Sequence, residues 1–158
     1  MVGSCPSSPP NIDIINPTHS LQAIQAKMTT LPQTTIRIKN IQTGRLLYDN
    51  ADKGLISWEE STNTDGYWYI TPMAEKIYKI KNRLSGNAIY FNTSQQKPIT
   101  WKDSFNEDGK WEVVFLTAKT FKLRNVESPN IFLYDNPDKG LIGYHDNDHT
   151  DGIWTYLD

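Results

Sequence analysis

Apolar and polar residues alternate over short stretches of the chain from Ile36 onward. Residues 36–39, Ile-Arg-Ile-Lys, have a period of two, which is typical of a strand with one buried face. Glycines and Asp-Gly pairs follow such stretches at turn positions, beginning with Gly44 and Gly54. The pattern therefore predicts short strands joined by tight turns.

This strand pattern occurs three times. Residues 36–40, 78–82 and 121–125 match one another and each ends in Asn, at intervals of 42 and 43 residues. Each copy continues with the same four marks at nearly constant spacing, which indicates internal duplication. The marks are a tyrosine (Tyr48, Tyr90, Tyr134), a second aromatic residue (Trp58, Trp101, Tyr144), an Asp-Gly pair (Asp65, Asp108, Asp151) and a closing tryptophan (Trp68, Trp111, Trp154).

Three copies of about four strands leave few architectures open. A propeller needs at least about four blades, and a solenoid needs polar terminal caps that are absent from this sequence. Closing three copies around one axis buries the closing tryptophans in equivalent places and leaves few exposed strand edges. We therefore expect an all-β protein, a β-trefoil of three four-strand repeats at about 36–77, 78–120 and 121–158.

The first 34 residues differ from the repeats. Ser and Pro crowd the first ten positions, while Leu21, Ile24 and Met28 have the spacing of one short helix around 19–29. We interpret 1–34 as an N-terminal extension, loop or short helix, with a linker to a partner domain as the alternative. Residues 35–158 form the expected trefoil domain.

Composition and charge exclude several classes of protein. The 158 residues carry a formal net charge of −2 with a pI near 5.9, which argues against nucleic acid as a partner. No stretch reaches the roughly 18 apolar residues of a membrane span, so no membrane insertion is expected. The one cysteine, Cys5, excludes a disulfide within the chain. The start lacks a signal peptide, which favours a cytoplasmic or non-classically secreted protein, with an excised secreted domain as the alternative.

One repeat resembles a known family. Residues 78–86, Tyr-Lys-Ile-Lys-Asn-Arg-Leu-Ser-Gly, followed by Ile89, look like the opening of a repeat of the ricin B-chain-like lectin family. The three Asp-Gly-x-Trp stretches resemble that family's Gln-x-Trp ending. The resemblance covers 36–158 and implies a β-trefoil that binds carbohydrate without catalysis or cofactor. The family's galactose-type Asp is replaced by Tyr48, Tyr90 and Tyr134, so its site cannot be transferred residue by residue.

The strand-joining loops of repeats one and three suggest a sugar site. Residues 47–56 and 133–142 differ only at Ala51 and Pro137, whereas 89–99 of repeat two contain no carboxylate. Aromatic faces together with carboxylates and amides are what a pyranose requires, although tight turns favour the same polar residues. We predict sugar sites in repeats one and three and an inactive repeat two. The predicted site residues are Tyr48, Asp49, Asn50, Asp52, Lys53, Tyr134, Asp135, Asn136, Asp138 and Lys139.

The remaining aromatic and acidic marks receive other assignments. Tyr48 and Tyr134 fall on the strand face opposite to the apolar residues before them, so we expect their rings to be exposed. Trp58, Trp101 and Tyr144 share a face with isoleucines two positions earlier and are predicted to be core, with an exposed strand end as the alternative. The closing tryptophans are predicted to lie in the core. The Asp-Gly aspartates are interpreted as turn residues, with a ligand role as the alternative.

No catalytic or metal constellation is expected. His145 and His149 would share a face on a helix but not in an extended loop, so we expect no metal. No nucleophile lies beside a base, and no pair of carboxylates is specifically matched. The sequence thus predicts a non-enzymatic, lectin-like module without cofactor, whose partners are glycans or glycoconjugates. A homodimer is left open, and the rival function is a protein-binding β-trefoil such as a protease inhibitor or a cytoskeletal or toxin-associated module.

Overall fold

The structure is a computed structural model and describes residues 30–158. These residues include one compact unit that runs from Leu31 to Asp158. The predicted helix at 19–29, and nearly all of the extension, lie outside the described residues.

Each repeat contributes four short strands with turns between them. Repeat one contains β1 (Thr35–Asn40), β2 (Leu46–Asn50), β3 (Gly54–Trp58) and β4 (Trp68–Ala74). Repeat two contains β5 (Ile77–Asn82), β6 (Asn87–Asn92), β7 (Lys97–Lys102) and β8 (Trp111–Phe115). Repeat three contains β9 (Thr120–Asn125), β10 (Phe132–Asn136), β11 (Gly140–Tyr144) and β12 (Trp154–Leu157). The third and fourth strands are joined by short 3-10 turns, η2 (Thr64–Gly66), η3 (Glu107–Gly109) and η4 (Thr150–Gly152).

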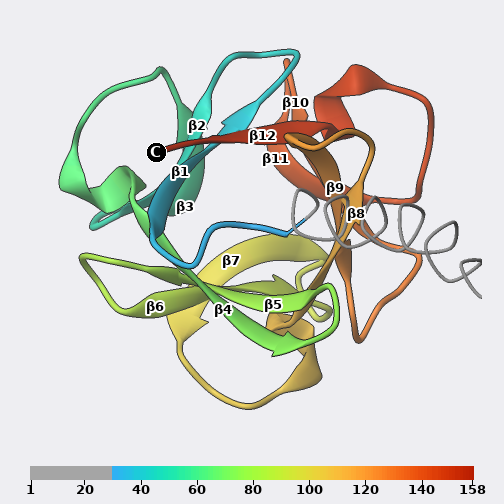
Figure 1. Cartoon of the computed structure of the whole chain (residues 1–158), viewed down its shortest axis with the longest axis horizontal. Helices are drawn as coiled ribbons and strands as arrows, with labels where there is room; N and C mark the ends of the chain where they lie inside the picture. The colour runs from blue at the N-terminus through green and yellow to red at the C-terminus, as the bar shows by residue number, and fades with distance from the viewer. Residues whose placement is uncertain (1–29) are drawn as a thin grey trace, which may run out of the picture. The chain divides into compact units, whose positions relative to one another are not determined.

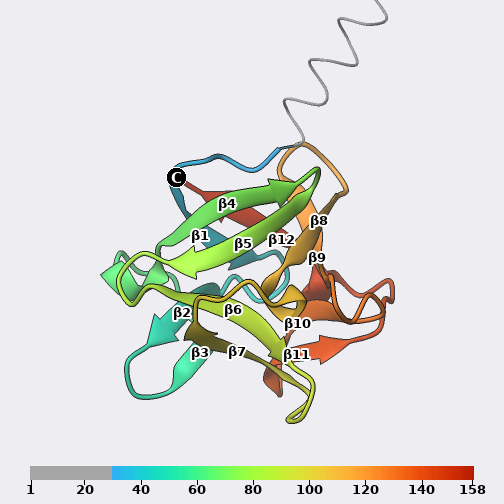
Figure 2. The same cartoon turned by 90° about the horizontal axis from the view of Figure 1, so that it is seen from below.

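The outer strands of the three repeats close into a barrel. Antiparallel pairs run from β1 to β4, β5, β8, β9 and β12, and β12 pairs with β1 again. The other strands form three hairpins, β2–β3, β6–β7 and β10–β11. Figure 1 shows the repeats arranged around a common centre, and Figure 2 shows the hairpins on one side of the barrel. The fold is the predicted β-trefoil.

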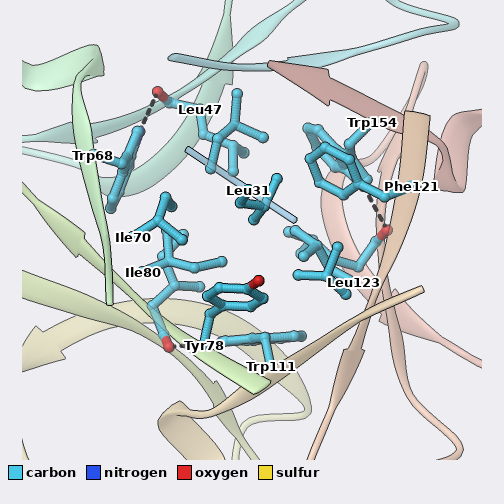
Figure 3. Packing of buried hydrophobic residues seen from close by; sticks show 14 of the residues in the cluster. Leu31, Leu47, Trp68, Ile70, Tyr78, Ile80, Trp111, Phe121, Leu123 and Trp154 are labelled. Carbon is cyan, nitrogen blue, oxygen red and sulfur yellow. Dashed lines mark hydrogen bonds between the residues drawn. The ribbon is translucent and has the colours of Figure 1, made fainter. Parts of the chain in front are cut away.

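The closing tryptophans fill equivalent places in the core. Trp68, Trp111 and Trp154 are fully buried, which confirms their assignment from the sequence. Each indole Nε1 donates a hydrogen bond of 2.9–3.1 Å to a backbone carbonyl in the second strand of its own repeat. Truncating a Trp packed in this way to Ala typically costs about 3–5 kcal/mol. Figure 3 shows Leu31 in the midst of the cluster, so a residue that the sequence placed in the extension belongs to the core.

A buried asparagine ends the first strand of each repeat. The side-chain Nδ2 atoms of Asn40, Asn82 and Asn125 each donate a 2.9 Å hydrogen bond to a backbone carbonyl in a 3-10 turn of another repeat. The Oδ1 atom accepts hydrogen bonds from the backbone of the following turn. These asparagines therefore fix the 3-10 turns relative to the barrel, which explains why Asn closes all three sequence copies.

Candidate functional site

Each repeat has a surface pocket at the same place, between its hairpin and its 3-10 turn. The repeat-one, repeat-two and repeat-three pockets have volumes of about 170, 490 and 600 Å³. Equivalent residues line all three pockets. They include the second-strand tyrosine, an isoleucine and an aromatic residue of the third strand, and the aspartate of the 3-10 turn. The threefold repeat of the sequence therefore produces a threefold repeat of one candidate site.

The aromatic residues at or near the end of the third strands are exposed walls of these pockets. Trp58 is 59% exposed, Trp101 65% and Tyr144 43%. Their assignment to the core is therefore wrong, and the exposed alternative holds. The isoleucines on the same strand face are only half-buried and line the pockets as well. The sequence correctly placed each isoleucine and aromatic residue on one face of the third strand, but this face borders the pocket instead of the core.

The tyrosines Tyr48 and Tyr134 cannot serve as exposed stacking faces. They are only 4% and 2% exposed, because their strand face is covered by the loop that leads to the 3-10 turn. Tyr48 donates a 2.7 Å hydrogen bond to the Glu59 carbonyl, and Tyr134 donates one of 2.9 Å to the His145 carbonyl. Tyr90 does the same in repeat two. The tyrosines thus line the pockets from below and hold the pocket loops in place.

Burial also affects the acidity of Tyr134. Removal from water raises the pKa of the Tyr134 phenol, and the nearby carboxylates of Asp146 and Asp151 raise it further. The backbone hydrogen bond from Asn147 acts in the opposite direction. The phenol is therefore kept as a neutral hydrogen-bonding group at neutral pH.

Asp135 is a structural residue that joins repeats three and one. Its buried carboxylate accepts hydrogen bonds from Thr43 Oγ1 at 2.5 Å, Arg45 Nε at 2.8 Å and Ser57 Oγ at 2.6 Å. Arg45 adds a second hydrogen bond at 3.0 Å to the other oxygen of the same carboxylate. These contacts leave little capacity for the hydroxyl groups of a ligand.

Asp49 occupies the corresponding position between repeats one and two. It accepts hydrogen bonds from Ser85 Oγ at 2.5 Å, Asn87 Nδ2 at 3.0 Å and Thr100 Oγ1 at 2.6 Å. The expected ligand contacts of Asp49 and Asp135 are therefore replaced by contacts within the protein. Repeat two has Phe91 here, buried and packed so closely on Gly143 that a Cβ there would lie 2.4 Å from its ring.

The other predicted residues divide between turns and pockets. The Oδ1 atoms of Asn50 and Asn136 accept hydrogen bonds from the backbone of the hairpin turns, yet both residues also line their own pockets. Asp52 and Asp138 are exposed at the hairpin tips and are not among the residues that line these pockets. Lys139 lines the repeat-three pocket, whereas Lys53 lines the pocket of repeat two. The structure therefore does not assemble the ten predicted residues into two sites.

The aspartates of the 3-10 turns are the pocket residues that the sequence analysis undervalued. In Asp65, Asp108 and Asp151 the Oδ1 atom is buried and has no hydrogen-bond partner among residues 30–158. All three side chains line the pockets. A buried carboxylate oxygen without a partner is costly, and all three repeats carry this cost at equivalent positions. The repeated Asp-Gly pair was the available signal, but it is equally typical of a turn.

Basic side chains on the barrel strands also hold the pocket loops in place. Arg37, Lys79 and Lys122 each donate a hydrogen bond to a carbonyl of the loop that follows the third strand. Lys79 also pairs with Asp103, and its hydrogen bond lowers the pKa of that carboxyl. In the same manner, Lys39 lowers the pKa of Glu60. The pocket loops are thus fixed by tyrosine hydroxyls and by cations, which makes the pockets preformed.

No group of three or more His, Cys, Asp or Glu within residues 30–158 is arranged to hold a metal ion. The ring of His145 lies against that of Tyr144, with centroids 4.0 Å apart, and His149 lines the repeat-three pocket. No helix in this part of the chain has the length and apolarity to cross a membrane.

Comparison with solved structures defines the class of fold. The chain is similar to the designed threefold symmetric protein ThreeFoil, with a TM-score of 0.71 and 17% identity over 78% of this chain and 98% of that chain. It is also similar to SeviL bound to the asialo-GM1 saccharide, with a TM-score of 0.67 and 15% identity over 80% and 98% of the two chains. A third similar structure is that of Polyporus squamosus lectin, bound to a human-type influenza-binding epitope. Its TM-score is 0.70 at 16% identity, over 80% of this chain and 49% of that chain.

These likenesses show that the chain is a β-trefoil. No protein-family model matches the sequence, and no curated protein matches it. The identities are too low to carry ligand residues from one protein to the other.

Proposed function

We propose that this protein is a carbohydrate-binding module with one saccharide pocket in each of its three repeats. The observation that carries the proposal is the repeated pairing of an exposed aromatic ring with an aspartate of the 3-10 turn among the residues that line one pocket. A pyranose offers both complements, because its C–H face stacks on an aromatic ring and its hydroxyls donate hydrogen bonds to a carboxylate. Two of the similar structures, SeviL and Polyporus squamosus lectin, are complexes with saccharides, which supports the same class of ligand.

Each residue of the pocket has a separate role in this proposal. Trp58, Trp101 and Tyr144 supply the stacking face for the sugar ring. The aspartates accept the hydroxyl hydrogen bonds, and Asn63, Asn106 and His149, two positions before them, provide further polar contacts at the rim. Repeat two thus belongs among the binding repeats, in contrast to the interpretation from its hairpin sequence.

The proposed function is binding without catalysis. Hydrolysis of a glycosidic bond usually requires two carboxyl groups on opposite sides of the bond. Asp108 is the one carboxylate among the residues that line the repeat-two pocket, and Asp151 is the one in repeat three. These two pockets can hold a sugar but lack the second group that this reaction needs. The repeat-one pocket is lined by Glu59, Glu60 and Asp65, and Glu60 is ion-paired with Lys39.

Three similar pockets on one rigid body favour multivalent binding. Each pocket is shallow, so each contact with a sugar is weak by itself. Simultaneous occupation of two or three pockets on a surface coated with glycans raises the apparent affinity by a factor of about 10²–10⁴. The natural ligand of such a protein is a clustered glycan on a cell or a glycoprotein.

A glycan array with variants of the aromatic residues tests the proposal. We expect the parent protein to bind a defined set of glycans, the single variants Trp58→Ala, Trp101→Ala and Tyr144→Ala to bind more weakly, and the triple variant to lose binding. Asp138→Asn, at an exposed hairpin tip, is the matched control and should bind as the parent does. A parent that binds no glycan, or a folded triple variant that binds as the parent does, contradicts the proposal and favours a protein partner.

A further inference from the structure

The three pockets differ in charge. The repeat-one pocket is lined by Glu59, Glu60 and Asp65 and by no lysine. The repeat-two pocket is lined instead by Lys53 and Lys97, with Asp108 as its one acidic residue. The acidic pocket repels an anionic ligand, whereas the repeat-two pocket attracts one.

The lysines around repeat two are available for a ligand. Lys53, Lys97 and Lys102 form no ion pair within the described part of the chain, whereas Lys39, Lys79, Lys110 and Lys122 all do. The ammonium of Lys53 lies 5.8 Å from the centroid of the Trp58 ring. This contact is weak at an exposed site, so it leaves the charge free to meet an anion.

Trp101 separates the repeat-two pocket from a second hollow. We name this second hollow the inter-repeat groove; it has a volume of about 530 Å³. Its lining residues include Leu84, Asn87 and Lys102 together with the carboxylates of Asp49 and Asp65, so the groove suits a neutral sugar unit. Gly54, Thr100 and Trp101 line both hollows, so the two adjoin. An indole that is 65% exposed and borders both hollows offers more contact surface than one sugar ring covers.

The walls of the inter-repeat groove have the mixed character of a saccharide subsite. Leu84 is exposed and supplies an apolar surface for C–H groups. Asn87 donates one hydrogen bond to Asp49, and its Oδ1 atom has no partner among residues 30–158. At the junction of repeats three and one, Arg45 stands at the position of Asn87 and is engaged by Asp135. The groove beside Trp101 is therefore not a simple consequence of the threefold repeat.

We propose that repeat two carries an extended site for an acidic oligosaccharide, with one unit in the repeat-two pocket and the next in the inter-repeat groove. The acidic group is a carboxylate or a sulfate ester on the unit in the repeat-two pocket, where Lys53 and Lys97 are the lining lysines. Trp101 contacts both sugar units. The inference rests on the proposed function and adds to it the class of glycan that one repeat selects.

Matched pairs of glycans test this inference. The probes are pairs on one array that differ by a single acidic group: a neutral oligosaccharide with its sialylated form, and another with its sulfated form. We expect the acidic members to bind the parent about tenfold more tightly at low salt, with the excess falling as salt is raised. The separate sialylated and sulfated pairs show whether the lysines select a carboxylate, a sulfate or both.

Lysine variants then locate the acidic group. Lys53→Gln and Lys97→Gln should each weaken binding of the acidic members about two- to fivefold and leave the neutral members unchanged. Lys119→Gln, at an exposed lysine that lines none of the hollows described here, is the matched control. Equal binding of acidic and neutral members, or an excess that survives the double variant of Lys53 and Lys97, overturns the inference while the proposed function stands. Absence of binding to every glycan on the array overturns both.

Discussion

Gly109 lies directly against the ring of Tyr90. A Cβ atom at Gly109 would be 2.3 Å from Tyr90 Cε2, far inside van der Waals contact. The same relation joins Gly66 to Tyr48 at 2.7 Å and Gly152 to Tyr134 at 2.4 Å. Glycine therefore follows the pocket aspartate in every repeat because the buried tyrosine needs the space.

Gly109→Ala should consequently destabilise the protein. Forcing a methyl group against a buried ring typically costs about 1–3 kcal/mol of the free energy of unfolding. We expect a lower urea midpoint and a lower Tm for Gly109→Ala. In a background that carries Tyr90→Ala, the same substitution should cost less, because the ring that it meets is gone. An equal cost in both backgrounds would show that the clash is not the cause.

Asp135→Ala should destabilise the protein without any ligand present. Removing one partner of a buried ion pair leaves the other without its hydrogen bonds and typically costs about 3 kcal/mol or more. The carboxylate of Asp135 is fully buried, while the side chain of Arg45 is partly exposed. Asp138→Ala, three residues later at the exposed hairpin tip, should change the free energy of unfolding by about 0.5 kcal/mol at most. Similar urea midpoints for the two variants would argue against a structural role of Asp135.

Asp151→Ala should separate stability from binding. The buried Oδ1 atom of Asp151 has no partner within residues 30–158, so its removal relieves a desolvation cost of about 1–3 kcal/mol. We expect a Tm equal to or above that of the parent, together with weaker glycan binding by the repeat-three pocket. Calorimetric titration with an array-positive glycan and a thermal melt on the same sample provide the two measurements. A clear loss of Tm would instead assign Asp151 to the scaffold.

Acid should weaken the contact of Asp103 with Lys79. The hydrogen bond and charge of Lys79 lower the pKa of Asp103 below the usual value of 3.8 for an aspartate, so the folded state favours the ionised carboxylate. The resulting stability is present above the pKa of about 3.8 that the carboxyl has in the unfolded chain, and it is lost as the pH falls through the lowered pKa of the folded state. Asp103→Asn should therefore lower the urea midpoint at pH 7 more than at pH 2. A difference between parent and variant that does not change with pH would contradict this assignment.

The barrel could be predicted from the sequence because its determinants recur at fixed intervals. The strand alternation, the strand-ending asparagines and the closing tryptophans all serve packing or backbone hydrogen bonds that every repeat needs. Because every repeat has the same packing and hydrogen-bonding requirements, the same residues recur in all three copies, and each copy supports the interpretation of the other two. The spacing of Trp68, Trp111 and Trp154 alone was enough to place these residues in the core.

The site was harder to predict because strand alternation shows which residues share a face, but not what covers that face. Ile56 and Trp58 do share a face, yet it borders a pocket, and Tyr48 on the neighbouring strand is covered by a loop. The near-identical hairpin sequences of repeats one and three also suggested a shared ligand site at their aspartates. The retained Asp49 and Asp135 serve the junctions with the following repeats, a long-range contact that a local pattern cannot reveal.

The pairing of β1 with β12 has a consequence for the order of the repeats. Arg37 pairs with Leu157 and Asn40 with Trp154, so the first and last strands of the trefoil are neighbours in one ladder. A covalent link between these ends, with the chain opened between β4 and β5 instead, would leave all other strand pairs in place. The molecule is in this sense a ring whose starting point is arbitrary, and a circular permutant that begins at repeat two should reach the same fold.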